Sequence, residues 1–196
     1  MVNVATNKGL PEGRLQRKMS IGGVYVATFC QIIMRHGLIM GAISLLCLVL
    51  PGAIDAVIVY LAPLISEPYP YVAILPVMLV FFVVFLVLKG HKVDISQGAW
   101  LGYLWAISVV EELSFRLIIP TLLLGLIGLI PAVMLSNLVF ASIHFFTLRW
   151  KFINCFGAFL GGLALSRLLN NTEDIALVIL VHWFFTFLNT PTSPKA

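Results

Sequence analysis

The chain contains few charged residues. Only 10% of its 196 residues are Asp, Glu, Lys or Arg, whereas about a quarter is usual for a soluble domain. At the same time 61% are hydrophobic, and the mean hydropathy is +1.06. This balance excludes a soluble globular domain and is typical of an integral membrane protein. The net charge of +4 does not indicate a nucleic-acid partner, because most basic residues lie in the first twenty positions or between apolar segments.

Cysteine is scarce as well. The chain has only Cys30, Cys47 and Cys155, all in apolar surroundings, and no two of them form a CxxC pair. An odd number of widely spaced cysteines excludes a disulfide framework. We therefore interpret the three thiols as buried packing residues.

Long apolar segments alternate with short polar breaks along the chain. About 17–25 apolar residues are enough for a helix to cross a bilayer. The sequence therefore predicts an all-α fold, a polytopic transmembrane bundle of about six to eight membrane helices around a buried polar site. Arg35-His36 is expected to interrupt the first apolar stretch, and Pro120 to kink or divide the long segment 98–130. The apolar segments are 21–34, 37–65, 71–88, 98–130, 131–148, 152–169 and 175–188.

The basic residues predict the domain organisation and the orientation. Residues 1–20 are interpreted as a basic leader, 21–190 as one transmembrane domain whose motif-bearing core is 98–189, and 191–196 as a polar tail. Lys and Arg favour the cytoplasmic side of a membrane. The leader, and with it the N-terminus, is therefore expected in the cytoplasm.

Two adjacent carboxylates, Glu111 and Glu112, lie in a strongly apolar stretch with Arg116 close behind them. Each charge at bilayer depth costs at least about 2.5–3.5 kcal/mol on insertion scales. Glu112 and Arg116 are four residues apart, so they share a helical face and can pair. Glu111 points about 100° away from Glu112 and is not offset by that pair. A buried carboxyl group without a partner suits a general base.

His144 lies in a later apolar segment, with polar and aromatic companions at helical spacing. Phe140 precedes it by four residues and Asn137 by seven, so all three share one face. A lone buried histidine usually has a structural role. A histidine with such companions, together with a buried glutamate elsewhere, points to a shared polar site.

His182 lies in the last apolar segment and shows the same pattern. Thr186 and Asn189 follow it by four and seven residues and lie on its face. Ionisable residues in membrane spans usually face one interior or one cavity. We therefore expect Glu111, His144 and His182 to meet in one site.

This set of residues suits the hydrolysis of a peptide bond. Glu111 with His144 can hold and deprotonate a water molecule, and His182 with Thr186 or Asn189 can donate hydrogen bonds to the developing oxyanion. The motifs of other intramembrane proteases are absent, since the sequence has no HExxH, no GxGD-type aspartate pair and no GxSG-like serine turn.

Other readings use the same residues. A proton-coupled transporter would use the glutamate and the histidines as a relay across the bilayer, but only Asp55 could extend such a chain. A non-enzymatic membrane immunity or scaffold protein is a further alternative. A zinc ion bound by Glu111, His144 and His182 ranks below a metal-free site, because no two ligands have helical i, i+4 spacing and Arg116 adds positive charge nearby.

The motifs in their order resemble those of a known family. The chain is similar to the CPBP family, the CAAX-protease and bacteriocin-processing or Abi membrane proteins, which are related to the type II CAAX prenyl endopeptidases. The resemblance covers about residues 98–189. The residues that carry it are Glu111-Glu112-x-x-x-Arg116, Phe140-x-x-x-His144, the glycine-rich stretch 156–162 and His182 in the last span.

The resemblance implies roles for these residues. Glu111 would be the catalytic glutamate, His144 its water-binding partner and His182 the oxyanion donor, while Glu112 and Arg116 support the site. It also implies a peptidase without a cofactor in the plasma membrane of a prokaryote. Its partners would be the lipid bilayer and a membrane-associated protein or peptide, lipidated or carrying a C-terminal sorting anchor, and no nucleic acid.

The chain departs from the family pattern in the last motif. That motif commonly reads HxxxN, but Thr186 stands where the asparagine is expected. Asn189 lies about one helical turn further on and could take its place. Alternatively, the hydroxyl group of Thr186 could donate the hydrogen bond.

Overall fold

A computed structural model describes residues 15–17 and 26–194 of the chain. The predicted basic leader, apart from 15–17, lies outside the described residues, and so do 195–196 of the predicted polar tail. Nearly all of 26–194 is helical. The described residues contain no strand, and an isolated bridge joins Gln16 to Trp150. The predicted all-α fold is confirmed.

The helices follow one another with short connections. Two π-helical segments, labelled η1 and η2, continue directly into the α-helices beside them. The elements in chain order are α2 (Phe29–Ile32), η1 (Ile33–Gly37), α3 (Leu38–Leu48), α4 (Ala53–Ser66), α5 (Tyr69–Leu88), α6 (Ile95–Glu112), η2 (Leu113–Ile118), α7 (Ile119–Ile127), α8 (Leu129–Thr147), α9 (Phe152–Thr172) and α10 (Ile175–Asn189).

Four of the described helical stretches are long and apolar enough to cross a membrane. They are Phe29–Leu48, Tyr69–Leu88, Leu129–Thr147 and Phe152–Thr172, and Tyr69–Leu88 has the highest mean hydropathy, 3.0. The apolar helices α4 and α10 are shorter. Most side chains of α5 are exposed although they are apolar, as expected for a helix that faces lipid. The protein is therefore a polytopic integral membrane protein.

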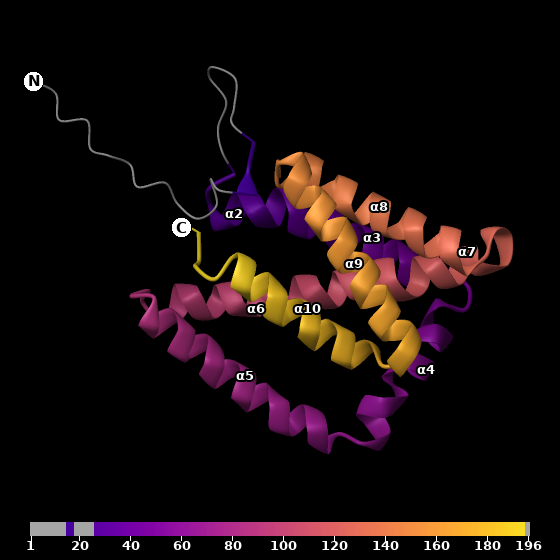
Figure 1. Ribbon diagram of the computed structural model, residues 1–196, viewed down its shortest axis with the longest axis horizontal. Helices are drawn as coiled ribbons and strands as arrows, with labels where there is room; N and C mark the ends of the chain where they lie inside the picture. Colours follow the sequence, from indigo (N-terminus) through magenta and orange to yellow (C-terminus); the bar gives the residue numbers. More distant parts are fainter. Residues whose placement is uncertain (1–14, 18–25, 195–196) are drawn as a thin grey trace, which may run out of the picture.

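The central pair of the bundle is α6 and α10, which pack side by side (Figure 1). α8 packs against α7 and α9, and α3 contacts α6 and η2. α5 lies at the periphery (Figure 1), where Phe82 contacts the aromatic rings of Trp183 and Phe187 on α10. The continuous rod of α6, η2 and α7 is thus enclosed by several helices, and its middle can carry charges away from lipid.

The expected break at Arg35-His36 is wrong. The chain stays helical from Phe29 to Leu48, because both polar side chains find hydrogen-bond partners on neighbouring helices. Arg35 Nε donates to the carbonyl of Thr147, 3.1 Å away, at the C-terminal end of α8. His36 is buried and bonds to Glu111 and Thr147. The N-terminus of the helix is set by Thr28, whose hydroxyl accepts from the Gln31 amide in a capping box.

Pro120 does not divide the segment 98–130. The rod continues through Pro120 to Ile127 and ends at Gly128, whose φ of 78° is in the region that favours glycine. A proline cannot donate to the carbonyl four residues earlier. Here it follows directly after the π-helical segment Leu113–Ile118, where the hydrogen-bond register already changes. The helix therefore runs on.

Gly162 lies where three helices approach closely. A Cβ atom at this position would lie 2.1 Å from Asn137 Oδ1 and 3.0 Å from an Arg116 guanidinium nitrogen. Asn137 cannot turn away easily, since its side-chain amide donates to the Val133 carbonyl and to Ser166 Oγ on α9. Only glycine fits here, because α9 approaches α8 and η2 too closely for a side chain.

We predict that Gly162→Ala lowers the thermal stability of the purified protein by about 1–3 kcal/mol, the usual cost of overpacking. The measurement is the melting of the protein in detergent, followed by size-exclusion recovery. Gly161→Ala is the matched control, because a Cβ at Gly161 meets no atom within 4 Å. Equal stability of the two variants would contradict the close approach.

Candidate active site

The Glu111 carboxylate is the centre of a buried cluster of imidazole rings. Glu111 is the penultimate residue of α6, and 3% of it is exposed. Its Oε1 lies 2.9 Å from Nε2 of His36 and 3.7 Å from Nε2 of His144. Its Oε2 lies 3.6 Å from Nε2 of His182. The structure therefore brings together the three residues expected from the sequence and adds a fourth, His36.

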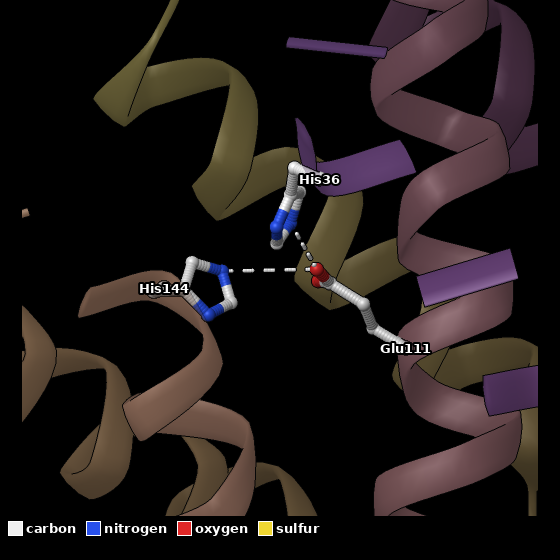
Figure 2. A group of neighbouring side chains, drawn as sticks. All are labelled: His36, Glu111 and His144. Atoms are coloured by element: carbon white, nitrogen blue, oxygen red, sulfur yellow. Dashed lines mark hydrogen bonds and ion pairs between the residues drawn. The ribbon is translucent and has the colours of Figure 1, made fainter. Parts of the chain in front are cut away.

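His36 is the residue that sequence reasoning missed. The sequence places it with Arg35 in a polar break between two apolar segments, whereas in the structure it lies in η1 within a continuous helix and is buried. Its Nδ1 is 2.9 Å from Thr147 Oγ1, and its Nε2 is bonded to Glu111 (Figure 2). Glu111 is thus not the unpartnered carboxylate that the sequence predicted. The one available signal was the brevity of the break, only two residues.

The ring of His144 is held in a fixed orientation. Its Nδ1 is hydrogen bonded to the carbonyl of Phe140, 2.9 Å away, one turn earlier in α8. The rings of Phe140 and Trp150 lie on either side, with centroids 4.6 Å and 4.7 Å from that of His144. This packing leaves Nε2 pointing toward Glu111 (Figure 2).

Glu112 is fully buried beside Glu111 and has two cationic or polar neighbours. Arg116 Nε lies 3.5 Å from Oε2, so the pair expected from the spacing is present. His182 Nδ1 lies 2.6 Å from Oε1, a close contact without hydrogen-bond alignment. The Arg116 guanidinium also stacks over Phe140, 3.9 Å from the ring centroid. His182 therefore bridges the two carboxylates, and Phe140 supports both Arg116 and His144.

The other predicted supporting residues lie at different distances from this centre. Thr186 and Asn189 line the same cavity as His182, and Asn189 is the exposed last residue of α10. Asn137 is fully buried and joins α8 to α9, rather than contacting the glutamate. Asp55 is exposed in the first turn of α4 and is not among the residues that line the cavity.

The cluster lies in the wall of a cavity of about 670 Å³. Most other lining residues are aliphatic or aromatic, and three glycines of α9 also line the cavity. A Cβ atom would meet no neighbour at two of them, Gly157 and Gly161, which therefore leave room on one side. The buried hydroxyl of Tyr103 also lies in this wall and has no hydrogen-bond partner among the described residues. The glycines are Gly157, Gly161 and Gly162.

This arrangement is suited to two functions, the activation of a water molecule and the binding of a metal ion. A carboxylate with imidazoles within reach, in a pocket of low dielectric, can activate a water molecule. The ligand atoms of His36, Glu111 and His144 also lie within 4.8 Å of one another, so these three residues could hold a metal ion. The buried Glu112–Arg116 pair lies beside this set and joins the end of α6 to η2.

Comparison with known families gives one match. Residues 79–188, more than half of the chain, match the family described as type II CAAX prenyl endopeptidase Rce1-like. The match contains Glu111, His144 and His182, whereas His36 lies outside it. No curated protein matches the chain, and neither does any solved structure.

We predict that Glu112→Gln destabilises the protein by about 3–5 kcal/mol, the usual cost of removing one partner of a buried ion pair. The change leaves the Arg116 charge buried without its carboxylate. The measurement is the melting temperature in detergent. The exposed Glu67→Gln serves as the control, and it should leave the melting temperature unchanged.

The double variant Glu112→Gln with Arg116→Met separates the pair from general packing. Removing both charges should recover part of the lost stability, because no charge is then left unpaired. The single variant Arg116→Met completes the comparison. If the double variant loses as much stability as the two single variants together, the ion pair does not account for the effect.

Proposed function

Because the chain belongs to the Rce1-like family of type II CAAX prenyl endopeptidases, we propose that it is a glutamate-dependent intramembrane endopeptidase. It would hydrolyse a peptide bond near the C-terminus, or at a membrane-proximal site, of a membrane-associated protein. The observation that carries this proposal is the Glu111 carboxylate, buried in an apolar cavity with Nε2 of three imidazoles around it.

In the proposed mechanism, Glu111 and His144 hold the attacking water. Their facing atoms are 3.7 Å apart, which is too long for a direct hydrogen bond but short enough for one water to contact both. Glu111 takes a proton from this water as the oxygen attacks the scissile carbonyl carbon. His36, bonded to Oε1, fixes the orientation of the carboxylate, in the way that the third member of a catalytic triad orients its neighbour.

The oxyanion that forms in this step needs hydrogen-bond donors. His182 is suited to this role, since its Nδ1 faces the Glu112 carboxylate and its Nε2 lies toward the cavity and Glu111. Thr186 and Asn189 line the same cavity on the same helix. Either of them could supply the second donor in place of the usual asparagine.

The lining of the cavity favours a substrate that carries an apolar group. Its wall is mainly apolar, and Gly157 and Gly161 of α9 leave space in the cavity that Glu111 also lines. A lipidated C-terminal peptide or a C-terminal membrane anchor would fit such a surface. Burial of an apolar chain there would contribute roughly 25 cal/mol per Å².

We place the protein in the plasma membrane of a prokaryote with its N-terminus in the cytoplasm. The Lys151 amide donates to the carbonyl of Leu15, and the Arg17 amide donates to that of Arg149. Basic residues of the leader and of the α8–α9 connection therefore lie on one side of the bundle. The positive-inside rule assigns this side to the cytoplasm. A relay across the membrane has less support, because Asp55 does not extend the cluster.

The central test is cleavage by the purified protein in lipid vesicles. Three reporter peptides separate the substrate classes: an isoprenylated CAAX tail, the same tail without lipid, and a peptide with a C-terminal transmembrane anchor. We predict that Glu111→Gln lowers cleavage by about 10²–10⁴-fold, the contribution of a general base. The exposed Glu67→Gln is the matched control. Cleavage at the wild-type rate by Glu111→Gln, detected by product mass, would contradict the mechanism.

The oxyanion site makes a separate kinetic prediction. His182→Ala should lower kcat by about 10²–10³-fold, the effect of losing one oxyanion donor, with little change in KM. Thr186→Val removes a hydroxyl at nearly constant shape, and Asn189→Leu removes an amide. The variant that loses kcat identifies the second donor. Wild-type kcat in all three variants would exclude this oxyanion site, and melting curves control for folding.

A further inference from the structure

His36 and His144 present the same nitrogen to Glu111. The hydroxyl of Thr147 donates its only hydrogen to the Ile143 carbonyl, 2.7 Å away, so it can only accept from Nδ1 of His36. The Phe140 carbonyl likewise can only accept from Nδ1 of His144. The hydrogen-bond network therefore assigns the Nδ1 hydrogen to both rings and leaves both Nε2 atoms directed at the carboxylate.

Two imidazole Nε2 atoms and a carboxylate oxygen thus converge in a buried site. All three residues are at most 5% exposed, and they come from three different segments, η1, α6 and α8. Acceptors that face one another in a dry site need a positive centre between them, which is either a shared hydrogen or a cation. We propose that His36, Glu111 and His144 form a binding site for a divalent transition metal, with Zn²⁺ as the best match.

The distances fit a zinc ion with small adjustments. Tetrahedral zinc with bonds of about 2.0–2.1 Å separates neighbouring ligand atoms by about 3.3 Å. The observed separations from Glu111 Oε1 are 2.9 Å to His36 Nε2 and 3.7 Å to His144 Nε2 (Figure 2). All three ligand atoms lie within 4.8 Å of one another. Side-chain shifts that bring the two histidine nitrogens to the tetrahedral separation would complete the site.

The donor set and its surroundings also fit zinc. Two histidines and one glutamate form a known zinc ligand set that leaves a further position open, and here all three residues line the cavity. Histidines that bind metals usually donate their other ring hydrogen to an oxygen, which orients the ring. Thr147 Oγ1 and the Phe140 carbonyl are such oxygens.

The geometry favours His36 over His182 as the third ligand. His182 Nδ1 lies 2.6 Å from Glu112, and its Nε2 approaches Oε2 of Glu111 rather than the oxygen that the other two histidines share. The Arg116 charge is balanced by Glu112, which removes the main electrostatic objection to a cation. This ligand set therefore differs from the one that the sequence suggested for zinc.

Metal binding does not depend on peptidase activity, so it can be tested alone. If the proposed function also holds, the ion and the attacking water would use the same Glu111 oxygen, and added Zn²⁺ would inhibit cleavage. That inhibition rests on the proposed function, whereas the binding site does not. Zn²⁺ binding without peptidase activity would support the metal site and contradict the proposed function. Peptidase activity without Zn²⁺ binding would do the reverse.

The experiment measures Co²⁺ binding to the full chain in detergent, with the purification tag removed. Tetrahedral Co²⁺ ligated by nitrogen and oxygen gives a visible absorption band, which Zn²⁺ should abolish by displacement. We expect one saturable site per chain in the wild type. Binding should weaken more than 100-fold in His36→Asn, and 10–100-fold in Thr147→Val, which removes only an outer hydrogen bond. His91→Asn, at a histidine outside the cavity, is the matched control and should bind as the wild type does. His182→Asn should keep the band, because His182 is not a ligand in this set.

The opposite pattern would overturn the proposal. It is overturned if the wild type shows no saturable tetrahedral band, or if His182→Asn loses the band while His36→Asn keeps it. Either result excludes this ligand set. If His36→Asn fails to fold, as judged by size exclusion and melting, Thr147→Val and Zn²⁺ displacement from the wild type still decide the question.

Discussion

The burial of the Glu111 carboxylate is the constraint on which the rest of the site depends. Burying a charge in the middle of an apolar bundle costs more free energy than a single contact between helices contributes, unless other groups compensate the charge. Here the compensation comes from three imidazoles on η1, α8 and α10, so each of these elements must hold its position relative to α6. The same requirement brings several titratable groups together in one place. Such clusters of buried titratable groups are typical of reactive sites.

The two π-helical segments connect local backbone geometry with this site. η1 carries His36, and η2 begins directly after the two glutamates and carries Arg116. π-helical turns are rare in proteins, and many of those that occur lie at functional sites. The wider turn redirects the side chains around it. In this bundle η1 brings His36 to Glu111, while Glu112 of α6 and Arg116 of η2 pair with each other.

Composition and motif spacing predicted much of this structure. The membrane bundle follows from the apolar content, and the Glu112–Arg116 pair follows from helical periodicity, which is a local property. His36 could not be found in this way, because its role depends on a contact between segments 75 residues apart in the sequence. The partners of His182 have the same origin, since Glu112 reaches it only through the packing of α6 on α10. The course of the helix through Arg35 and Pro120 likewise depends on tertiary partners and on the π-helical register.

The central claim is that Glu111 drives proteolysis of membrane-associated proteins. Its most direct test is a comparison of the termini of membrane proteins in cells that carry the wild-type chain or Glu111→Gln, measured by mass spectrometry. The account predicts a set of new C-terminal or membrane-proximal termini that are present with the wild type and missing with the variant at equal protein levels. Identical termini in the two strains, with both proteins folded and in the membrane, would contradict it.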